Sequence, residues 1–317
     1  MRKSTLWLRH IYKNTKWGFY LIGPIKTLYD FIIYRMIPKQ IFIKLKFRLA
    51  FGYQLDLHNP KTLNEKIQWL KLFYNNLELH TTCADKYAVK QYIKEQIGES
   101  YVVPLIFETF NYLDIKKENI PDYPVIIKAT HNSGGFIILK NKKSANWEII
   151  QRDCKRWLKE NYYYIGKEVP YKNIPPRIIV EKLLIDDEGN IPLDYKVHCF
   201  NGLPQMIQVD LYRGTAKHAR NWYNTNWQRE PYRWSSLYPD GKLTDPCDED
   251  AEKPVALKKM LKLSAMLSKK FKYVRIDWYI LDNQIYFGEF TFHHDGGLRP
   301  ILPEKYDLIL GNRLNLQ

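Results

Sequence analysis

The fold of this chain is decided by one stretch, YVRIDWYILDNQIYFGEFT, at residues 273 to 291. Two runs rich in β-branched and aromatic residues, Val274 to Ile280 and Ile285 to Phe290, flank the turn-forming sequence Asp282-Asn283-Gln284. Such a pattern predicts two strands joined by a short turn. We therefore expect a β-hairpin here.

The polar side chains of this hairpin suggest chemistry. Because side chains alternate along a strand, Arg275 and Asp277 share one face, and Glu289 and Thr291 share a face of the returning strand. If the two polar faces coincide, a guanidinium, two carboxylates and a hydroxyl converge. Oxygen ligands of this kind suit Mg²⁺ bound together with phosphates. The alternative is a polar hairpin face that carries only a surface ion pair.

The composition is that of a folded, basic protein. Of the 317 residues, 45% are hydrophobic and 15% are aromatic, unlike a disordered chain, and the length predicts two or three packed lobes. The net charge of +15 predicts an acidic partner such as anionic lipid, nucleic acid, nucleotide or a polyanionic glycan. Four widely spaced cysteines indicate neither a zinc site nor a disulfide framework. Without a signal peptide or a transmembrane run in the sequence, we expect a cytoplasmic protein.

Most of the net charge lies at the amino-terminal end. Residues 1 to 50 hold eleven Lys or Arg residues and one acid, Asp30, and apolar residues such as Trp7, Trp17 and Phe31 lie between the cations. This mixture predicts helices on an anionic membrane surface, at the inner face of the plasma membrane. The alternative is a basic helical lobe packed on the main body.

A second candidate site lies near the middle of the chain. Pro124 to Ala129 predicts a strand interrupted by Lys128, and the loop from Thr130 to Phe136 contains Ser133, Gly134 and Gly135. Glycines let backbone N–H groups approach an anion and a lysine neutralises it, so the pattern predicts a lid over phosphates. No Walker motif is present. An ordinary glycine-containing turn beside an exposed lysine is the alternative.

Periodicity places the remaining elements. Thr62 and Glu65 have the spacing of a capping box, so a helix is expected to begin there, and another is expected from Asp85 to Gly98. We predict strands at residues 177–184, 194–200 and 206–211, helices at 146–164 and 254–271, and a loop at 213–237.

This order of features resembles the ATP-grasp superfamily, and more closely its TupA-like proteins, which are associated with teichuronopeptide and other bacterial surface polysaccharides. The matching phrases are LNEKIQWLKL, ADKYAVKQYI, RIIVEKLL, DYKVHCFNG, VRIDWY and IYFGEFTF. The resemblance implies an α+β, ATP-grasp fold, with two α+β lobes clasping ATP. We expect a basic helical segment at 1–80, a lobe with the lysine strand and lid at 81–175, and a lobe with the metal-binding hairpin at 176–317.

The resemblance also assigns the ATP contacts. Lys86, on a helix, and Lys128 would lie along the phosphates. The lid over them would include His131, Ser133, Gly134 and Gly135. Glu181 and the backbone of Lys182 to Leu184 would hold the adenine, and Asp194 would lie near the ribose hydroxyls.

The hairpin would supply the metal ligands and the catalytic cation. Asp277, Glu289 and Thr291 would hold Mg²⁺, and Arg275 would stabilise the negative charge that develops during the reaction. The superfamily commonly has Asn at the position of Thr291, so this chain offers a hydroxyl in place of an amide carbonyl, which weakens or removes one ligand of a second metal ion.

Six residues are candidates for substrate contact: Arg213, Lys217, Arg220, His293, His294 and Arg299. Aromatic residues near the first three, Trp222, Tyr232 and Trp234 among them, could stack on sugar rings. The alternative for the first three residues is a basic, aromatic loop that only covers the core. The alternative for the two histidines is a solvated turn. The two histidines lack the spacing of a helical zinc site.

The activity implied by the resemblance is ligation of a carboxylate to an amine through an acyl phosphate, with ATP and Mg²⁺. The implied partners are an amino acid or peptide and a uronic acid of a bacterial surface polysaccharide or its lipid-linked precursor; no nucleic acid is expected. One alternative is a glycosyltransferase in capsule, O-antigen or teichuronic-type polysaccharide synthesis. Another is a non-enzymatic basic protein that binds membrane or nucleic acid.

Overall fold

The computed structural model describes residues 28, 31–74, 77–237 and 241–317. The chain divides into two compact units, residues 1–54 and 55–317, and each is described by itself. The membrane-surface helices expected within residues 1–27 lie outside the described residues. The first unit contains the π-helix η1 (Ile32–Met36) and the helix α3 (Lys39–Phe51), which ends at Gly52 with a left-handed φ of 82°.

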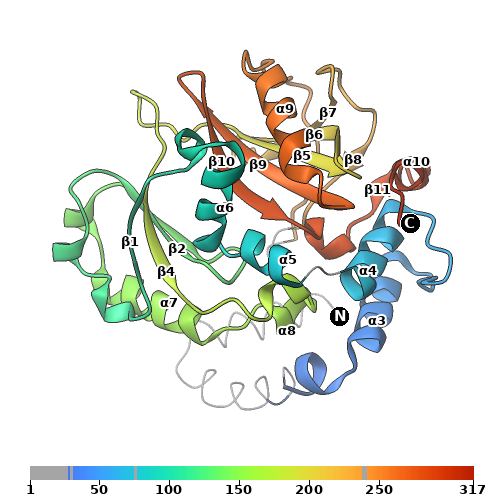
Figure 1. Cartoon of the computed structure of the whole chain (residues 1–317), viewed down its shortest axis with the longest axis horizontal. Helices are drawn as coiled ribbons and strands as arrows, with labels where there is room; N and C mark the ends of the chain where they lie inside the picture. Colours follow the sequence, from blue (N-terminus) through green and yellow to red (C-terminus); the bar gives the residue numbers. More distant parts are fainter. Residues whose placement is uncertain (1–27, 29–30, 75–76, 238–240) are drawn as a thin grey trace. The chain divides into compact units, whose positions relative to one another are not determined.

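The second unit contains a five-stranded antiparallel sheet, ordered β10-β9-β5-β6-β7 (Figure 1). Its strands are β5 (Asp194–Phe200), β6 (Leu203–Leu211), β7 (Ala219–Asn224), β9 (Tyr273–Leu281) and β10 (Gln284–Thr291). The helix α9 (Leu257–Ser268) packs on the apolar face of this sheet, where Met260 joins Val197, Ile207 and Ile276 in one buried core. The predicted hairpin is confirmed as β9 and β10.

The loop expected at residues 213–237 is partly wrong. It contains β7 and the short strand β8 (Arg233–Trp234). Trp222, Tyr232 and Trp234 are buried together in a second apolar core, because alternate residues of β7 and β8 face inward. The expectation that these rings stack on sugars is therefore corrected, since they stack on one another instead.

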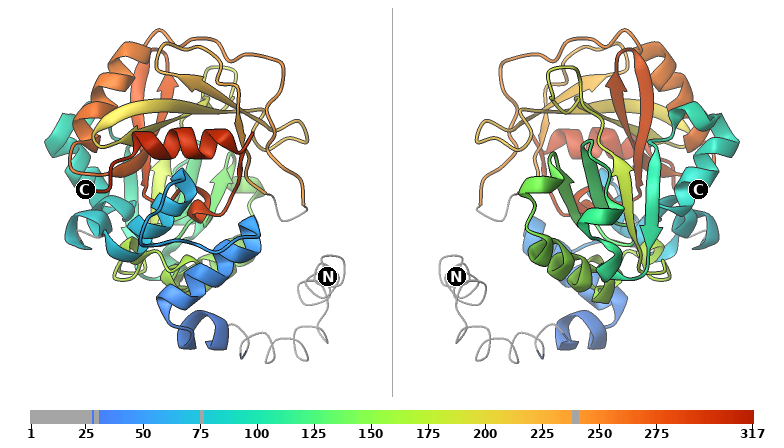
Figure 2. Two further views of the ribbon diagram at one scale, coloured as in Figure 1. Left: turned by 90° about the vertical axis from the view of Figure 1, so that its right-hand side faces the viewer. Right: turned by 90° about the vertical axis from the view of Figure 1, so that its left-hand side faces the viewer.

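A second, four-stranded antiparallel sheet is ordered β1-β4-β2-β3. Its strands are β1 (Leu105–Thr109), β2 (Val125–Ala129), β3 (Phe136–Leu139) and β4 (Ile178–Lys182). The helix α7 (Trp147–Lys159) covers one face, and Ile150 and Trp157 pack there against Ile127 and Val180 (Figure 2). The predicted lid connects β2 to β3. Because β4 pairs with β2, this sheet extends beyond residue 175, the boundary expected between the lobes.

Helices fill the space around the two sheets. The helix α4 (Leu63–Phe73) begins with the predicted capping box of Thr62 and Glu65, and α10 (Lys305–Arg313) packs against it. The prediction that Lys86 lies in a helix is wrong: Lys86 lies in the turn between α5 and α6. The other elements are α5 (Leu77–Ala84), α6 (Ala88–Ile97), α8 (Tyr163–Gly166), β11 (Ile301–Leu302), η2 (Glu99–Tyr101), η3 (Tyr112–Asp114), η4 (Lys117–Asn119), η5 (Lys142–Ser144), η6 (Val169–Tyr171) and η7 (His294–Gly297).

The α+β fold class with antiparallel sheets is confirmed. Within the described ranges, no helix combines the length and the apolar character that a membrane span requires.

Candidate active site

A β-bulge in the hairpin turns Glu289 toward the functional face. Phe287 pairs with Trp278 and Phe290 pairs with Ile276, so Gly288 and Glu289 stand together opposite the single residue Asp277. Strict alternation would have placed Glu289 on the core face with Phe287. The extra residue restores Phe290 to the core and leaves Glu289 facing outward from it.

Gly288 makes this bulge possible. A Cβ atom on residue 288 would lie 3.0 Å from the carbonyl oxygen of Asp277, closer than side chains normally approach. The hairpin strands therefore come together at the bulge only because residue 288 has no side chain.

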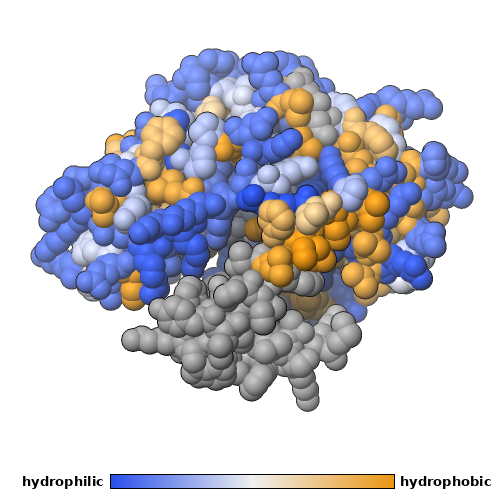
Figure 3. All heavy atoms as spheres, turned by 90° about the horizontal axis from the view of Figure 1, so that it is seen from below, coloured by the Kyte–Doolittle hydropathy of each residue, from blue (hydrophilic) through white to orange (hydrophobic). Residues whose placement is uncertain are grey.

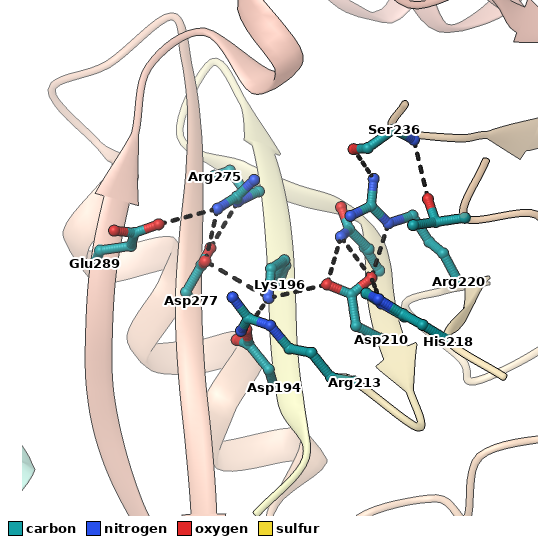
Figure 4. A network of polar contacts seen from close by, with 12 residues as sticks. Asp194, Lys196, Asp210, Arg213, His218, Arg220, Ser236, Arg275, Asp277 and Glu289 are labelled. Carbon is teal, nitrogen blue, oxygen red and sulfur yellow. Dashed lines mark hydrogen bonds and ion pairs between the residues drawn. The ribbon is translucent and has the colours of Figure 1, made fainter. Parts of the chain in front are cut away.

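Arg275 is the centre of the polar face. Its Nε and Nη2 atoms each donate to one carboxylate oxygen of Asp277 at 2.7 Å, and Nη2 also lies 3.2 Å from Glu289 Oε1 (Figure 4). Its third partner is the ring of His294, at 2.9 Å from Nη1. A bidentate guanidinium–carboxylate pair fixes orientation as well as distance. Arg275 is thus held rigidly at the surface of the five-stranded sheet.

Lys196 adds a second buried cation to this face. It projects from β5, next to β9, and makes ion pairs with Asp194, with Asp210 at 3.4 Å and with Asp277 at 3.8 Å. Figure 4 shows its ammonium group pointing among these three carboxylates. We name Lys196, Arg275, Asp277 and Glu289 the carboxylate cluster.

The charge of Asp277 is incompletely compensated in this cluster. Burial raises the pKa of Asp277 to about 6, although Arg275 and Lys196 act in the opposite direction. Asp210 shows the contrast: burial also disfavours its charge, but Lys196 and Arg220 outweigh burial and hold its pKa well below the usual range. A further cation would therefore stabilise the charged form of Asp277, whereas the charge of Asp210 is already compensated by its neighbours.

The four-stranded sheet carries an opposite arrangement. Glu181 of β4 is buried between Lys90 of α6 and Lys128 of β2, with 2.7 Å separating Lys128 Nζ from Glu181 Oε2. Lys86 lies nearby, and its Nζ donates to the carbonyl oxygen of Asn132 in the lid at 2.6 Å. We name Lys86, Lys90, Lys128 and Glu181 the lysine cluster. Two ammonium groups share one carboxylate and the third donates to a carbonyl oxygen, which leaves positive charge for an anion.

The two clusters act on each other. Burial raises the pKa of Glu289, but the charges of Lys86 and Arg275 outweigh burial and lower it. Burial lowers the pKa of Lys86, and the charge of Glu289 partly offsets this effect. Lys86 and Glu289 therefore lie near enough for their charges to interact, which brings cations suited to phosphate and carboxylates suited to a metal into one region.

The lid is anchored at one end and open at the other. His131 is buried, and one ring nitrogen lies 2.8 Å from the carbonyl oxygen of Trp157, so its ring ties the lid to α7. Burial lowers the pKa of His131. Ser133 and Gly134 are exposed, and Gly134 has a left-handed φ of 85°. A side chain on Gly135 would meet that of Asn132 within 3 Å, so the tight turn requires glycine.

The model of the TupA-like ATPgrasp family matches residues 65–315 of this chain. The chain belongs to the TupA-like ATP-grasp family. The predicted family, and with it the ATP-grasp fold, is confirmed. No curated protein matches the chain in sequence.

Solved structures similar to this ATP-grasp protein are ligases of low sequence identity. The D-alanine–D-alanine ligase from Bacillus anthracis is 15% identical with a TM-score of 0.35; the match covers 71% of this chain and 57% of that one. The corresponding enzyme from Helicobacter pylori is 14% identical with a TM-score of 0.40, covering 82% and 69%. The phosphoribosylamine–glycine ligase from Thermotoga maritima is 12% identical with a TM-score of 0.41, covering 70% and 52%. The chain thus spans little more than half the length of two of these three ligases.

The predicted metal ligands of this ATP-grasp protein suit Mg²⁺. Asp277 and Glu289 offer two carboxylates, and Thr291, which pairs with Arg275, offers a hydroxyl at the same face. Mg²⁺ typically takes one or two protein carboxylates and completes its shell with water and phosphate oxygens. Among the described residues, no group of three His, Cys, Asp or Glu side chains forms a ready metal cage. The donor set fits a metal that arrives with a nucleotide.

The predicted adenine and ribose contacts are distributed around β4 and β5. The N–H groups of Lys182 and Leu183 donate to the carbonyl oxygens of Pro104 and Pro124, at 3.0 and 3.1 Å, and Leu184 is buried. Asp194 pairs with Lys196 and, at 2.6 Å, with Nη1 of Arg213. Nucleotide contact at these positions stays a prediction.

The six substrate candidates differ in position. Arg213 reaches Asp194 from a half-exposed side chain, and Lys217 is exposed. Arg220 is buried, donating to Asp210 at 2.8 Å and to Ser236 at 2.6 Å. The remaining three residues lie in the segment after β10. The ring of His293 lies 3.1 Å from Glu168, and the ring of His294 contacts Arg275. The carbonyl oxygen of Arg299 accepts a hydrogen bond from Trp234. Their contact with a substrate is not tested by the structure.

Sequence reasoning missed Lys196, Asp210 and Lys90. A signal for Lys196 is present: in DYKVH, Asp194, Lys196 and His198 recur at every second position, so they share one face of a buried strand. A lysine beside an aspartate on such a face needs partners on neighbouring strands. No comparable signal exists for Asp210 or Lys90, whose partners are distant in sequence.

Proposed function

We propose that this protein is an ATP-dependent carboxylate–amine ligase that uses Mg²⁺. The observation that carries the proposal is the presence of two buried polar clusters, lysines gathered around Glu181 and two carboxylates held by Arg275 on the hairpin. A nucleotide triphosphate with Mg²⁺ is complementary to both, because its phosphates need cations and its metal needs carboxylates. Membership of the ATP-grasp family supports the same choice.

The residues of the lysine cluster would bind and desolvate the nucleotide. Lys86 and Lys128 would contact the phosphates beneath the lid of residues 131–135, where backbone N–H groups can add further hydrogen bonds. Glu181 with the backbone of residues 182–184 would hold the adenine, and Asp194 the ribose. Mg²⁺, when bound by Asp277 and Glu289 with Thr291, supplies charge compensation at the transferred phosphate.

Arg275 would stabilise the charge that develops during the reaction. An oxygen of the substrate carboxylate attacks the terminal phosphorus, the bond to the bridging oxygen breaks, and ADP leaves with an acyl phosphate remaining. The amine then attacks the acyl carbon, inorganic phosphate departs, and the amine loses a proton. Arg275 is suited to both steps because it is fixed before substrate arrives, so little reorganisation is needed.

The proposed substrates are an amino acid or peptide and a uronic acid of a bacterial surface polysaccharide or its lipid-linked precursor. The support is the TupA-like character of the family and the strongly basic chain, whose net charge of +15 suits a polyuronate. Arg213, which is half-exposed beside Asp194, is the candidate for contact with such an anion.

Acyl-phosphate formation can be tested by trapping. Purified protein is incubated with ATP, Mg²⁺, hydroxylamine and oligouronates, and separately with a panel of amino acids. We expect a hydroxamate from one of the two carboxylate classes together with stoichiometric ADP, and no product with Arg275→Ala. Absence of nucleotide binding in wild-type protein would refute the proposal at its base.

We also propose that the protein acts in the cytoplasm at the inner surface of the plasma membrane, where a lipid-linked substrate lies. In α3, Ile41, Leu45 and Leu49 recur at every fourth residue and are exposed, with Lys44 and Arg48 beside them. Apolar and basic groups on one helix suit an anionic lipid surface. Figure 3 shows exposed apolar side chains interspersed with hydrophilic ones on the face turned toward the viewer.

Sedimentation with lipid vesicles tests this localisation. We expect the full chain to bind vesicles that contain phosphatidylglycerol and not vesicles of phosphatidylcholine alone. Replacing Leu45 and Leu49 by Ser should weaken binding several-fold. Equal binding to both vesicle types would contradict a charge-assisted contact.

A further inference from the structure

We propose that His294 is a positioning residue that holds Arg275 in its reactive orientation when Mg²⁺ engages Asp277 and Glu289. The inference rests on the proposed function and adds a role for this chain's own loop after β10. It begins from the hydrogen bond of 2.9 Å between Arg275 Nη1 and His294 Nδ1.

The partners of Arg275 differ in their availability once a metal is bound. Asp277 and Glu289 supply its other hydrogen bonds, and both are candidate metal ligands. A metal ion draws carboxylate lone pairs away from the guanidinium, because both compete for the same oxygens. His294 accepts from a different nitrogen, Nη1, and lies on the other side of the guanidinium from this competition. Its hydrogen bond therefore persists when the carboxylate bonds are weakened.

The chemistry of the pair fixes the state of the imidazole. Arginine has only donors, so the Nδ1 atom of His294 must carry a lone pair and the ring must be neutral with its proton on Nε2. Asp295 Oδ2 lies 3.5 Å from this Nε2, too far for a hydrogen bond, and itself accepts from Ser236 at 2.5 Å. Its negative charge nevertheless favours the tautomer with the proton on Nε2, which presents the lone pair of Nδ1 to Arg275.

Aromatic rings hold the imidazole in place. His294 is fully buried, and the ring of Trp234 lies edge-on at a centroid distance of 4.4 Å, with His198 at 4.9 Å and Trp222 at 6.0 Å. These contacts leave the ring little freedom to rotate. The core that excludes Trp222 and Trp234 from sugar stacking therefore has another use, which is to clamp His294.

The backbone after His294 is equally fixed. Asp295, Gly296 and Gly297 all have left-handed φ angles, of 47°, 65° and 64°. The carbonyl of Gly296 accepts from both Gln68 and Lys71 of α4, at 2.8 and 2.7 Å. A Cβ on Gly297 would lie 2.5 Å from Gln68, so this turn needs glycine. The sequence His-Asp-Gly-Gly after β10 thus forms a rigid turn that fixes the backbone next to the histidine that contacts Arg275.

A matched pair of variants isolates the hydrogen bond from the packing. His294→Asn places an amide oxygen near the position of Nδ1, whereas His294→Leu has almost the same shape as Asn and no acceptor. Both replace the ring by a side chain that branches at Cγ, and Leu is the bulkier because its terminal groups are methyls. A purely structural role for His294 predicts that the two variants behave alike or that Leu, being apolar, is the more stable.

The probe is Mg·ADP with and without aluminium fluoride, which mimics the phosphoryl group in transfer; binding is followed by calorimetry. Wild type should bind Mg·ADP, and aluminium fluoride should tighten the complex. His294→Asn should keep this tightening to within about threefold, and His294→Leu and Arg275→Lys should lose about tenfold or more of it, the order expected for a hydrogen bond to a charged group. Binding of Mg·ADP alone should differ little between the Asn and Leu variants.

Three other outcomes would each contradict a different part of the proposal. Equal loss of tightening in the Asn and Leu variants would overturn the positioning role. A wild-type protein that binds Mg·ADP without any tightening by aluminium fluoride would overturn the assignment of Arg275 and His294 while leaving the nucleotide site intact. Failure of wild type to bind Mg·ADP would overturn the proposed function itself.

A second buried histidine serves as the control. His198 lies beside His294, but its Nδ1 contacts the hydroxyl of Tyr273 at 3.0 Å rather than Arg275. Because His198 packs against the ring of His294, His198→Asn and His198→Leu should both lower the melting temperature, and each should change the tightening by aluminium fluoride by a similar factor. A difference between them as large as that at residue 294 would show that the effect is not specific to the Arg275 contact.

Discussion

The lysine cluster and the carboxylate cluster are both buried charge networks, yet they differ in charge balance: three ammonium groups stand against one carboxylate in the first, and two cations stand against two carboxylates in the second. In the lysine cluster, Glu181 is shared by Lys90 and Lys128 while Lys86 is held by a carbonyl oxygen. In the carboxylate cluster, Asp277 keeps a pKa of about 6 despite two neighbouring cations. The first cluster has surplus positive charge, and the second offers two carboxylates, one of which, Asp277, is disfavoured by burial in its charged form.

This difference separates structural from functional charge. A buried network that only stabilises a fold should compensate each charge internally, as Asp210 is compensated by Lys196 and Arg220. A network with surplus lysines, beside one that offers two carboxylates, is complementary to a ligand that carries both phosphate groups and a metal ion. Metal-bound nucleotide has that character.

Removing a carboxylate from the second cluster should have the largest effect. We expect Asp277→Asn to weaken the Mg²⁺-dependent part of ADP binding by about 100-fold, because a metal ligand is lost and Arg275 loses its bidentate partner. Calorimetry with and without Mg²⁺ measures this part directly. Asp307→Asn is the control: Asp307 is also buried with a pKa raised to about 6, but its partner is Asn64. An equal loss in both variants would mean that general destabilisation, not metal binding, is being measured.

Replacing either of two lysines of the lysine cluster should weaken ADP binding, but to different extents. Lys128→Met should weaken ADP binding by about 10- to 100-fold, since a charge-assisted contact to phosphate is lost. Lys90→Met should cost less, about 3- to 10-fold, because Glu181 then draws on Lys128 alone. Fluorescence titration with ADP compares the two.

A surface lysine provides the reference for this pair. Lys94, one turn beyond Lys90 on α6, pairs with Glu99 at an exposed position, and Lys94→Met should leave ADP affinity unchanged. If Lys94→Met weakens ADP binding as much as Lys90→Met does, both losses are due to the lower overall positive charge and not to a specific contact.

Thr291, the weakest of the three proposed metal ligands, should have a small effect on the Mg²⁺ dependence of ADP binding. Thr291→Val keeps the shape and removes the hydroxyl, so we expect a few-fold increase in the Mg²⁺ concentration needed for half-maximal ADP binding. Thr291→Asn restores the amide found commonly in the superfamily and should change that concentration in the opposite direction. If both variants match wild type, Thr291 does not touch the metal.

The sequence was sufficient to predict the hairpin, the glycine-containing loop between β2 and β3, and the capping box of Thr62, because each depends on neighbours close in the chain. It could not show that Glu289 faces Arg275. That depends on the bulge at Gly288, and a bulge changes the register of two strands without altering the apolar pattern in an obvious way.

Other parts of the site depend on contacts between distant segments. The position of Lys90 against Glu181 joins α6 to β4, and Asp210 meets Arg220 and Lys196 across three strands. The strand β7 was missed because its polar and aromatic residues, Ala219 to Asn224, are all mostly buried within two cores, so no simple alternation marks them. Tertiary packing alone determines these features.

The smallest effect expected here concerns stability and pH. Burial raises the pKa of Asp307 to about 6, above its unfolded value of 3.8, so folding takes up a proton between these values. The free energy of unfolding should therefore rise as the pH falls from 7 to 5, by about 1 kcal/mol from this residue. Thermal unfolding of wild type and Asp307→Asn across this range checks it, since the variant should lack that increment. Parallel pH profiles for the two proteins would contradict it.

The central claim is that the two clusters together bind a metal–nucleotide complex. Calorimetric titration of the full chain with ADP, in Mg²⁺ and then in a chelator, tests it most directly. The account predicts one ADP per chain, bound about tenfold or more tightly with Mg²⁺ than without. Equal affinity under both conditions, or no binding in either, would contradict it.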